Sequence, residues 1–278
     1  MDLQIPDGLL RADAVALKTK VARFSEAGSD QLQVIFDFDR TLTTNLQGSS
    51  ENISSSHIMN FSLPPDGRKN YQQLFEYYRP LEIAGTMTTA DAVEWWSRAM
   101  RLFVDYRVDM TCIKQDFLSK VSIRPHTKEV LDLCKKLEIP TIILSAGVKN
   151  VIDMWMEAYD VRANVVLGNV LQIDVDGKVC GWDESAVMHI FNKHETGHPE
   201  LARIRAERSK TILIGDGMSD ADMAEGTDDV LRIRILDVCS DDLPSVKQQR
   251  EQTFQRFDAA IEDGSLQPLY ELLQQLAA

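Results

Sequence analysis

The sequence predicts an α/β fold: a doubly wound, Rossmann-like parallel sheet with a helical cap domain inserted into it. Three short apolar runs carry this prediction, LQVIFDF (residues 32–38), PTIILSAG (140–147) and KTILIGDG (210–217). Each run is rich in β-branched residues and ends in small or acidic ones, which is typical of strands buried on both faces of a parallel sheet. Segments with helical periodicity alternate with these runs, as the fold requires.

The cap is predicted from an interruption of this alternation. Residues 47–121 contain no buried-strand run and read as mostly helical, so we assign 1–46 and 122–278 to the core and 47–121 to the cap. The best-defined cap helix is TTADAVEWWSRAMRLFVDY, whose charged residues form one stripe on an otherwise apolar circumference. We therefore expect this helix to be covered on two sides, by the rest of the cap and by whatever lies between cap and core.

Further elements of the core follow from local patterns. The stretch RPHTKEVLDLCKKLEIP predicts a helix with Thr127 as its N-cap. Residues 148–159 predict a second helix, and Asp176 followed by Gly177 predicts a hairpin turn. Residues 241–278 read as helices that close the core.

Composition excludes several classes of function. The chain has 278 residues, 44% of them hydrophobic, and a formal net charge of −13, which repels nucleic-acid backbones and anionic membrane surfaces. We therefore expect neither a polymeric nucleic acid nor a membrane as partner. The four cysteines and five histidines show no spacing typical of a zinc site, a disulfide framework or a catalytic pair. With no apolar run near the N-terminus, we expect a cytoplasmic protein.

Acidic and small residues follow the three predicted strands. Asp37 and Asp39 leave the first strand, Ser145 and Ala146 end the second, and the pair Asp216 and Asp220 leaves the third. Because ligands of open parallel sheets bind beyond the carboxyl ends of the strands, we expect these side chains to meet there. Clustered carboxylates need a cation to remain ionised, and oxygen ligands without His or Cys favour magnesium.

These residues carry a resemblance to a known superfamily. DFDRTLTT resembles motif I of the haloacid dehalogenase superfamily (DxDxT), ILSAG resembles motif II, Lys193 in FNKHE the motif III lysine, and GDGMSD motif IV. From about Val21 to Gly226 the chain also resembles the type III cytosolic 5'-nucleotidases, through AGSDQLQVIFDFDRTLT, YRPLEI, VEWW, ILSAGV and IFNKHE. The resemblance implies a magnesium-dependent phosphohydrolase of nucleoside 5'-monophosphates with a haloacid dehalogenase-like core.

The resemblance also implies roles for individual residues. Asp37 would be the nucleophile that forms a phosphoaspartate, and Asp39 the general acid and base. Ser145, the amide of Ala146 and Lys193 would hold the phosphate. Magnesium would be bound by the Asp37 carboxylate, the Asp39 backbone carbonyl and Asp216, with Asp220 as outer-shell support.

Recognition of the base is expected in the cap. By the same resemblance, Glu82 would hydrogen-bond the base and an aromatic side chain of the EWW helix, Trp96 or its neighbour Trp95, would stack on it. Tryptophan at position 96 is typical of relatives that accept 7-methylguanosine monophosphate as well as CMP and UMP. Ala99 and Met100 stand where relatives commonly have Ser and His, so the sequence leaves the choice between pyrimidine and 7-methylguanine open.

Other functions share part of this pattern. A phosphatase for another small metabolite, of the phosphoserine phosphatase type, would use the same motifs, but Glu82 and Trp96 argue against it. A nucleoside phosphotransferase would pass the phosphate of the same intermediate to a nucleoside. A non-catalytic binding protein with this fold would be expected to have lost Asp37 or Asp39, and both are present.

Overall fold

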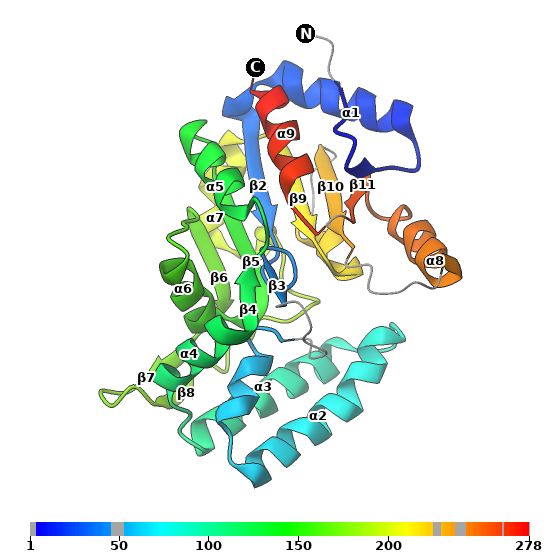
Figure 1. Ribbon diagram of the computed structural model, residues 1–278. Coiled ribbons are helices and arrows are strands. Elements are labelled where there is room, and N and C mark those ends of the chain that lie inside the picture. Colours follow the sequence, from blue (N-terminus) through cyan, green and yellow to red (C-terminus); the bar gives the residue numbers. More distant parts are fainter. Residues whose placement is uncertain (1–3, 46–52, 225–228, 237–242, 263, 278) are drawn as a thin grey trace.

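A mixed sheet forms the centre of the protein (Figure 1). The structure, a computed structural model, describes residues 4–45, 53–224, 229–236, 243–262 and 264–277. Within these residues the main sheet has seven strands, which in sheet order are β1 (Leu9–Leu10), β11 (Ala259–Ile261), β10 (Val230–Ile235), β9 (Lys210–Gly215), β2 (Leu32–Phe36), β5 (Thr141–Val148) and β6 (Val165–Asn169). Every neighbouring pair is parallel except β1 with β11. The three strands predicted from apolar runs are confirmed as β2, β5 and β9, which lie side by side.

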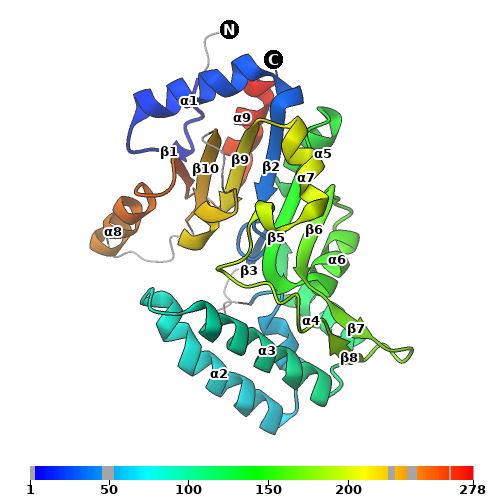
Figure 2. The same ribbon diagram turned by 180° about the vertical axis from the view of Figure 1, so that it is seen from behind.

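The two faces of β2 supply two hydrophobic cores. Val34 and Phe36 point into the core formed with α1 (Ala14–Ala27), α5 (Thr127–Lys136), α6 (Lys149–Ala158) and α9 (Gln267–Leu276). Ile35 points to the opposite face, where it packs in the cluster that includes Leu201 of α7 (Pro199–Glu207). Because side chains alternate along a strand, a continuous apolar run can cover both faces. Figures 1 and 2, seen from opposite sides, show α5 and α9 on one face of the sheet and α7 on the other.

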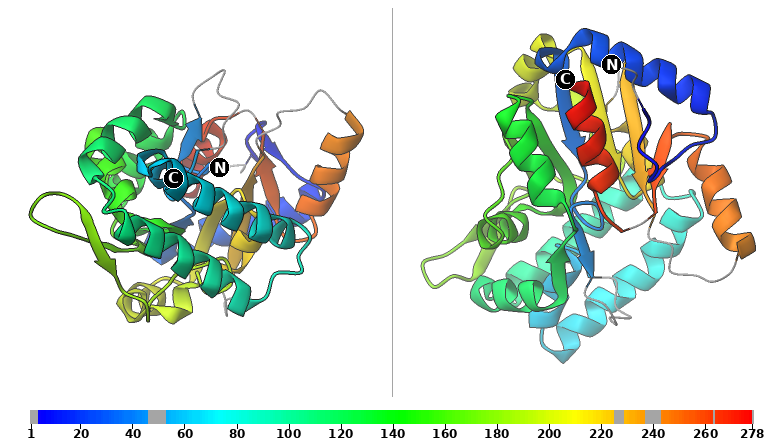
Figure 3. Two further views of the ribbon diagram at one scale, coloured as in Figure 1. Left: turned by 90° about the horizontal axis from the view of Figure 1, so that it is seen from below. Right: turned by 45° about the horizontal axis from the view of Figure 1, so that its top comes forward.

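A helical layer lies beyond the carboxyl ends of the strands (Figure 3). It contains the 3-10 helix η2 (His57–Ser62), α2 (Pro65–Ile83), α3 (Thr89–Asp105) and α4 (Met110–Lys120). The chain passes into and out of this layer through β3 (Thr43–Asn45) and β4 (Val121–Ile123), which pair antiparallel. The expected start of the cap at residue 47 lies outside the described residues. Among the described helices, none has the length and apolar character that crossing a membrane requires.

Helix α3 is built as its sequence predicts. Thr88 and Asp91 form a capping box at its N-terminus, which pairs backbone N–H groups that the helix itself leaves unpaired. One side of α3 packs on α2 through Trp95, which stacks on Tyr78 with ring centroids 5.7 Å apart. Another side, through Phe103, joins the core of the main sheet. The helix is therefore covered on two sides, as expected.

Two local predictions are wrong. Thr127 is the first residue of α5 and not its N-cap, which is His126 in the left-handed conformation with φ 67°. The Thr127 hydroxyl donates to the carbonyl of Leu42 instead, so a tertiary contact has replaced the local cap. The C-terminal segment is also not purely helical, because β11 lies between α8 (Leu243–Thr253) and α9 and extends the sheet.

The predicted hairpin is confirmed. β7 (Leu171–Ile173) and β8 (Val179–Trp182) pair antiparallel, and Gly177 between them has φ 78°, which favours glycine. The hairpin lies against α3, where the guanidinium of Arg101 is 4.7 Å from the centre of the Trp182 ring. This contact ties the helical layer to the core on one side.

Candidate active site

One cavity of about 800 Å³ lies between the strand ends and the helical layer. Every site residue expected from the sequence lines it: Asp37, Asp39, Glu82, Trp95, Trp96, Ser145, Ala146, Lys193, Asp216 and Asp220. The aspartates and the lysine come from the core, and Glu82, Trp95 and Trp96 come from α2 and α3. The cavity thus brings together residues from strand ends and from helices that lie far apart in the sequence.

The loop after β2 aims two carboxylates into the cavity. Asp37 continues the strand, its N–H donating to the carbonyl of Ile214 at 2.9 Å, and Phe38 turns the other way to pack edge-on against Trp155. Arg40 has φ 64° and reverses the chain. Arg124, which is 1% exposed, donates to the carbonyls of residues 40 and 41 and so stabilises this turn. Successive side chains at the end of the strand point to opposite sides, so Asp37 and Asp39 both line the cavity while Phe38 between them packs in the core.

Lys193 is buried between two carboxylates. Its ammonium group lies 2.5 Å from Asp37 Oδ1 and 2.8 Å from Asp220 Oδ1. Burial alone would lower the pKa of Lys193, but the charges of Asp220 and Asp37 raise it above its ordinary value. Lys193 therefore stays charged and holds a fixed positive charge beside the Asp37 carboxylate.

The acids of the cavity have raised pKa values. Burial raises the pKa of Asp37 to about 7, against the opposing charge of Lys193 and with the help of Asp220 and Asp216. Burial also raises the pKa of Asp216 to about 6, opposed by Arg40, whose Nε lies 2.8 Å from Asp216 Oδ2. Raised carboxylate pKa values in a cleft are typical of functional sites, because desolvated like charges are held together there.

Asp39 is held by a residue that the sequence did not single out. Its carboxylate accepts hydrogen bonds from the N–H of Ser55 at 2.7 Å and from the Ser55 hydroxyl at 2.6 Å. Burial raises the pKa of Asp39 to about 6, while these hydrogen bonds lower it. Ser55 is fully buried, yet it belongs to the polar stretch SSENISSSH, where composition indicates only a loop. No local signal distinguishes it from the neighbouring serines.

The end of β5 approaches Asp39 closely. The Ser145 hydroxyl accepts a hydrogen bond from the N–H of Gly147 at 3.0 Å. A Cβ atom on Gly147 would lie 1.9 Å from Ser55 Oγ and 2.9 Å from Asp39 Oδ2, so only glycine fits here. The Ala146 carbonyl accepts a hydrogen bond from the Asn169 side chain. The same side chain donates to the carbonyl of Met188 and accepts from its N–H, in the segment that precedes Lys193. Asn169 is a second residue that sequence patterns did not identify.

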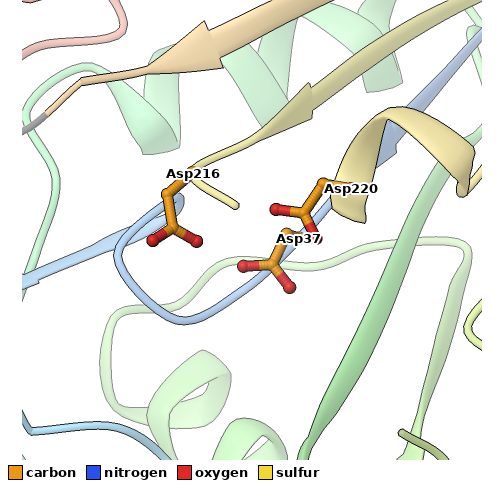
Figure 4. Close-up of side chains that lie close together, drawn as sticks. All are labelled: Asp37, Asp216 and Asp220. Atoms are coloured by element: carbon orange, nitrogen blue, oxygen red, sulfur yellow. The ribbon is translucent and has the colours of Figure 1, made fainter. Parts of the chain in front are cut away.

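Three carboxylates can share one ion (Figure 4). Asp37, Asp216 and Asp220 each offer an oxygen atom, and these atoms lie within 4.8 Å of one another. The Asp39 carboxylate, bound to Ser55, is not in this group. Carboxylate oxygens are the donors that hard divalent cations prefer, and the three carboxylates outnumber the two basic side chains that pair with them, Lys193 and Arg40. The donor set and its charge therefore fit a hard divalent cation.

The part of the cavity lined by the helical layer is aromatic. Trp96 is half-buried and donates its indole N–H to the carbonyl of Ala146, whereas Trp95 is 8% exposed and packs mainly within the helical layer. The Glu82 carboxylate forms an ion pair with Arg79. His57, one of the five histidines whose spacing indicated no site, also lines the cavity, next to Phe75 with ring centroids 6.3 Å apart. Its isolated position in the sequence offered no signal.

Comparison with known proteins agrees with this geometry. Residues 40–277 match the pyrimidine 5'-nucleotidase (UMPH-1) family. The chain is 29% identical over 268 residues to the 7-methylguanosine phosphate-specific 5'-nucleotidase of Rattus norvegicus, covering 92% of this chain and 88% of the relative. It is 31% identical over 258 residues to the protein of the same name from Gallus gallus, covering 87% and 86%.

Solved structures show the same fold. Cytosolic 5'-nucleotidase IIIB bound to cytidine superposes with a TM-score of 0.80 at 26% identity, covering 97% of this chain and 95% of that one. A substrate-bound phosphoserine phosphatase superposes with a TM-score of 0.57 at 14% identity, covering 87% and 97%, which shows the fold alone. The haloacid dehalogenase-like core expected from the sequence is thereby confirmed. The match over nearly the whole chain places this protein in the pyrimidine 5'-nucleotidase (UMPH-1) family.

Proposed function

We propose that the protein hydrolyses the 5'-phosphate of nucleoside monophosphates, with pyrimidine or 7-methylguanine as the base. The observation that carries the proposal is the cavity itself, whose lining combines a buried Asp37–Lys193 pair from the core with Glu82 and Trp96 from the helical layer. The names of the relatives support a nucleotide as substrate, and the cytidine-bound neighbour supports a nucleoside in such a cavity. In this proposal residues 47–121 act as the cap that recognises the base.

In the first half-reaction, an oxygen of Asp37 attacks phosphorus and the bond from phosphorus to the nucleoside 5'-oxygen breaks. Asp39 donates its proton to that leaving oxygen, a role that its pKa of about 6 allows. Lys193, the Ser145 hydroxyl and the Ala146 amide would hold the phosphate oxygens while charge shifts among them. The nucleoside leaves, and Asp37 carries the phosphate.

In the second half-reaction, water attacks the phosphoaspartate. Asp39, now ionised, accepts a proton from the water, and the bond between phosphorus and Asp37 breaks to release inorganic phosphate. Asp37 and Asp216 would hold a magnesium ion, with Asp220 supporting them while it bonds Lys193 and the N–H of Gly217. When bound, magnesium would neutralise negative charge on the phosphate oxygens.

The name of a Caenorhabditis elegans relative, putative cytosolic 5'-nucleotidase 3, supports action in the cytoplasm.

The test is a panel of phosphate-release assays with magnesium. The wild-type protein should hydrolyse CMP, UMP or 7-methylguanosine monophosphate with higher kcat/KM than phosphoserine. Asp37→Asn should abolish turnover, because an amide is a poor nucleophile of nearly unchanged shape, while the thermal unfolding transition remains cooperative. Wild-type turnover by Asp37→Asn would refute the mechanism, and preference for phosphoserine would refute the substrate.

A further inference from the structure

We propose that Arg79 sets the base preference of the cavity, selecting neutral pyrimidines over the cationic 7-methylguanine. The inference rests on the proposed function and narrows its substrate. Arg79 lies one helical turn before Glu82 on α2, and Arg79 Nη1 donates to Glu82 Oε2. Ion pairs at this spacing are common on exposed helix faces, but both of these side chains line the cavity. They are also largely covered, with 34% of the Arg79 side chain and 19% of the Glu82 side chain exposed.

The charge of the base end decides which base is attracted. A lone carboxylate beside a tryptophan face attracts a cation, through both the charge and the ring quadrupole. Arg79 cancels the charge of Glu82 and places a positive charge in the same part of the cavity. A 7-methylguanine ring carries a positive charge, whereas cytosine and uracil are neutral. Arg79 therefore removes the attraction that a lone Glu82 carboxylate would exert on the purine cation, and the neutral pyrimidines lose no such attraction.

The hydrogen-bonding pattern points the same way. The Watson–Crick edge of 7-methylguanine presents two adjacent donors, N1–H and the 2-amino group, which need both oxygens of a carboxylate. Arg79 donates to Oε2 of Glu82 and competes with the base for that oxygen, so the carboxylate is less available to two base donors at once. Together Glu82 and Arg79 offer an acceptor next to donors. This pattern matches cytosine, with its 4-amino donor beside the N3 acceptor, and uracil, with N3–H beside carbonyl oxygens.

Two residues that line the cavity on α3 offer a base little polar contact. Ala99 and Met100 line the same cavity and present no hydroxyl or other hydrogen-bonding side chain apart from a weak thioether acceptor. Trp96 stacks on any flat base and so does not discriminate by itself. Arg79 and Glu82 are therefore an oppositely charged pair that can distinguish the bases by charge.

The experiment compares wild type, Arg79→Gln and Arg79→Lys on CMP, UMP and 7-methylguanosine monophosphate, with p-nitrophenyl phosphate as a reference that has no base. Wild type should favour CMP and UMP. Arg79→Gln should raise the ratio of kcat/KM for 7-methylguanosine monophosphate to that for CMP about tenfold, because the negative charge of Glu82 is then uncompensated at short range from the base. Arg79→Lys keeps the charge and should keep the preference for pyrimidines.

Arg98→Gln is the matched control. Arg98 pairs with Glu94 on α3 at 3.2 Å, but neither residue lines this cavity, so the ratio should equal that of wild type. A wild-type preference for 7-methylguanosine monophosphate, or an unchanged ratio in Arg79→Gln, would overturn the role of Arg79 while nucleotide hydrolysis still supports the proposed function. Hydrolysis of p-nitrophenyl phosphate without hydrolysis of any nucleotide would overturn both.

Discussion

The indole N–H of Trp96 donates a hydrogen bond of 2.7 Å to the carbonyl of Ala146, which joins helix α3 to the end of β5. The same carbonyl accepts from Asn169 at 2.7 Å. A residue proposed to stack on the base is thus bonded to the loop proposed to hold the phosphate. The residue proposed to bind the base and the loop proposed to bind the phosphate are therefore linked through one backbone carbonyl.

Substitutions at Trp96 should separate stacking from this hydrogen bond. Trp96→Ala should lower kcat/KM for a nucleoside monophosphate roughly ten- to a hundredfold, because a base stacked on an aromatic ring contributes roughly 1–3 kcal/mol. Trp96→Phe keeps an aromatic face and loses the N–H. It should cost only about two- to tenfold, and equally for p-nitrophenyl phosphate, because a hydrogen bond contributes about 0.5–1.5 kcal/mol.

Trp95 provides the contrast for this pair of variants. Because Trp95 is largely buried against Tyr78, Trp95→Ala should mainly destabilise the protein, by roughly 3–5 kcal/mol. Thermal unfolding measures this loss.

Equal effects of Trp96→Ala and Trp96→Phe on nucleotides would mean that stacking is not the role of Trp96.

Asp216→Asn should abolish magnesium binding. The substitution removes one of three carboxylates that can share an ion and leaves Arg40 without its partner, so the remaining charge favours a cation less. Isothermal titration calorimetry with magnesium measures this directly, without reference to activity. Asp222→Asn is the matched control, since Asp222 lines the same cavity but pairs with Arg256. Undiminished magnesium binding by Asp216→Asn would exclude Asp216 as a ligand.

Ser55→Ala should change the pH dependence of the reaction. The Ser55 hydroxyl stabilises the ionised form of Asp39, so its removal should raise the Asp39 pKa above its value of about 6. Because Asp39 must be protonated to act as an acid, the alkaline limb of the kcat/KM profile should move to higher pH. Ser122→Ala, which removes a hydroxyl bonded to Thr44 outside the cavity, should leave the profile in place. An unshifted limb in Ser55→Ala would show that Ser55 does not tune Asp39.

Glu195→Gln should stabilise the protein increasingly as pH rises. Gln33 donates to Glu195 Oε2 at 3.0 Å, both residues are fully buried, and the two remaining oxygens, Gln33 Oε1 and Glu195 Oε1, have no hydrogen-bond partner among the described residues. A protonated Glu195 carries no charge in this buried site and has one fewer unpaired acceptor. Burial raises the pKa of Glu195. Protonated Glu195 therefore contributes fully to the free energy of unfolding below the ordinary pKa of 4.5, and this contribution is lost as pH rises through the raised pKa.

The amide of Glu195→Gln is uncharged at every pH. Urea unfolding at pH 5 and pH 8 should therefore show the greater gain at pH 8. Glu207→Gln, at a site where the glutamate pairs with Arg203 on the surface of α7, should show no such trend. A gain that does not depend on pH would mean that Glu195 is ionised in the folded protein.

Local patterns in the sequence determined the central strands and the chemistry placed at their ends. The apolar runs of β2, β5 and β9 can be buried only between two layers, and parallel strands bring their carboxyl ends to one edge. Asp37, Asp39, Ser145 and Asp216 could therefore be assigned to one site from their positions after these runs. Lys193 and Glu82 could be assigned to the site only through the resemblance to a family, because nothing in the neighbouring sequence distinguishes them from surface residues.

The tertiary structure alone decided the contacts between segments that lie far apart in the chain. Ser55 faces Asp39, Asn169 joins Ala146 to Met188, and Thr127 gives its hydroxyl to Leu42 instead of capping its own helix. Each of these polar residues has a common local role in a loop, a strand end or a helix terminus, and its sequence surroundings indicate that role. Their actual partners depend on how the layers pack, because a hydrogen bond forms wherever folding places a donor against a buried acceptor.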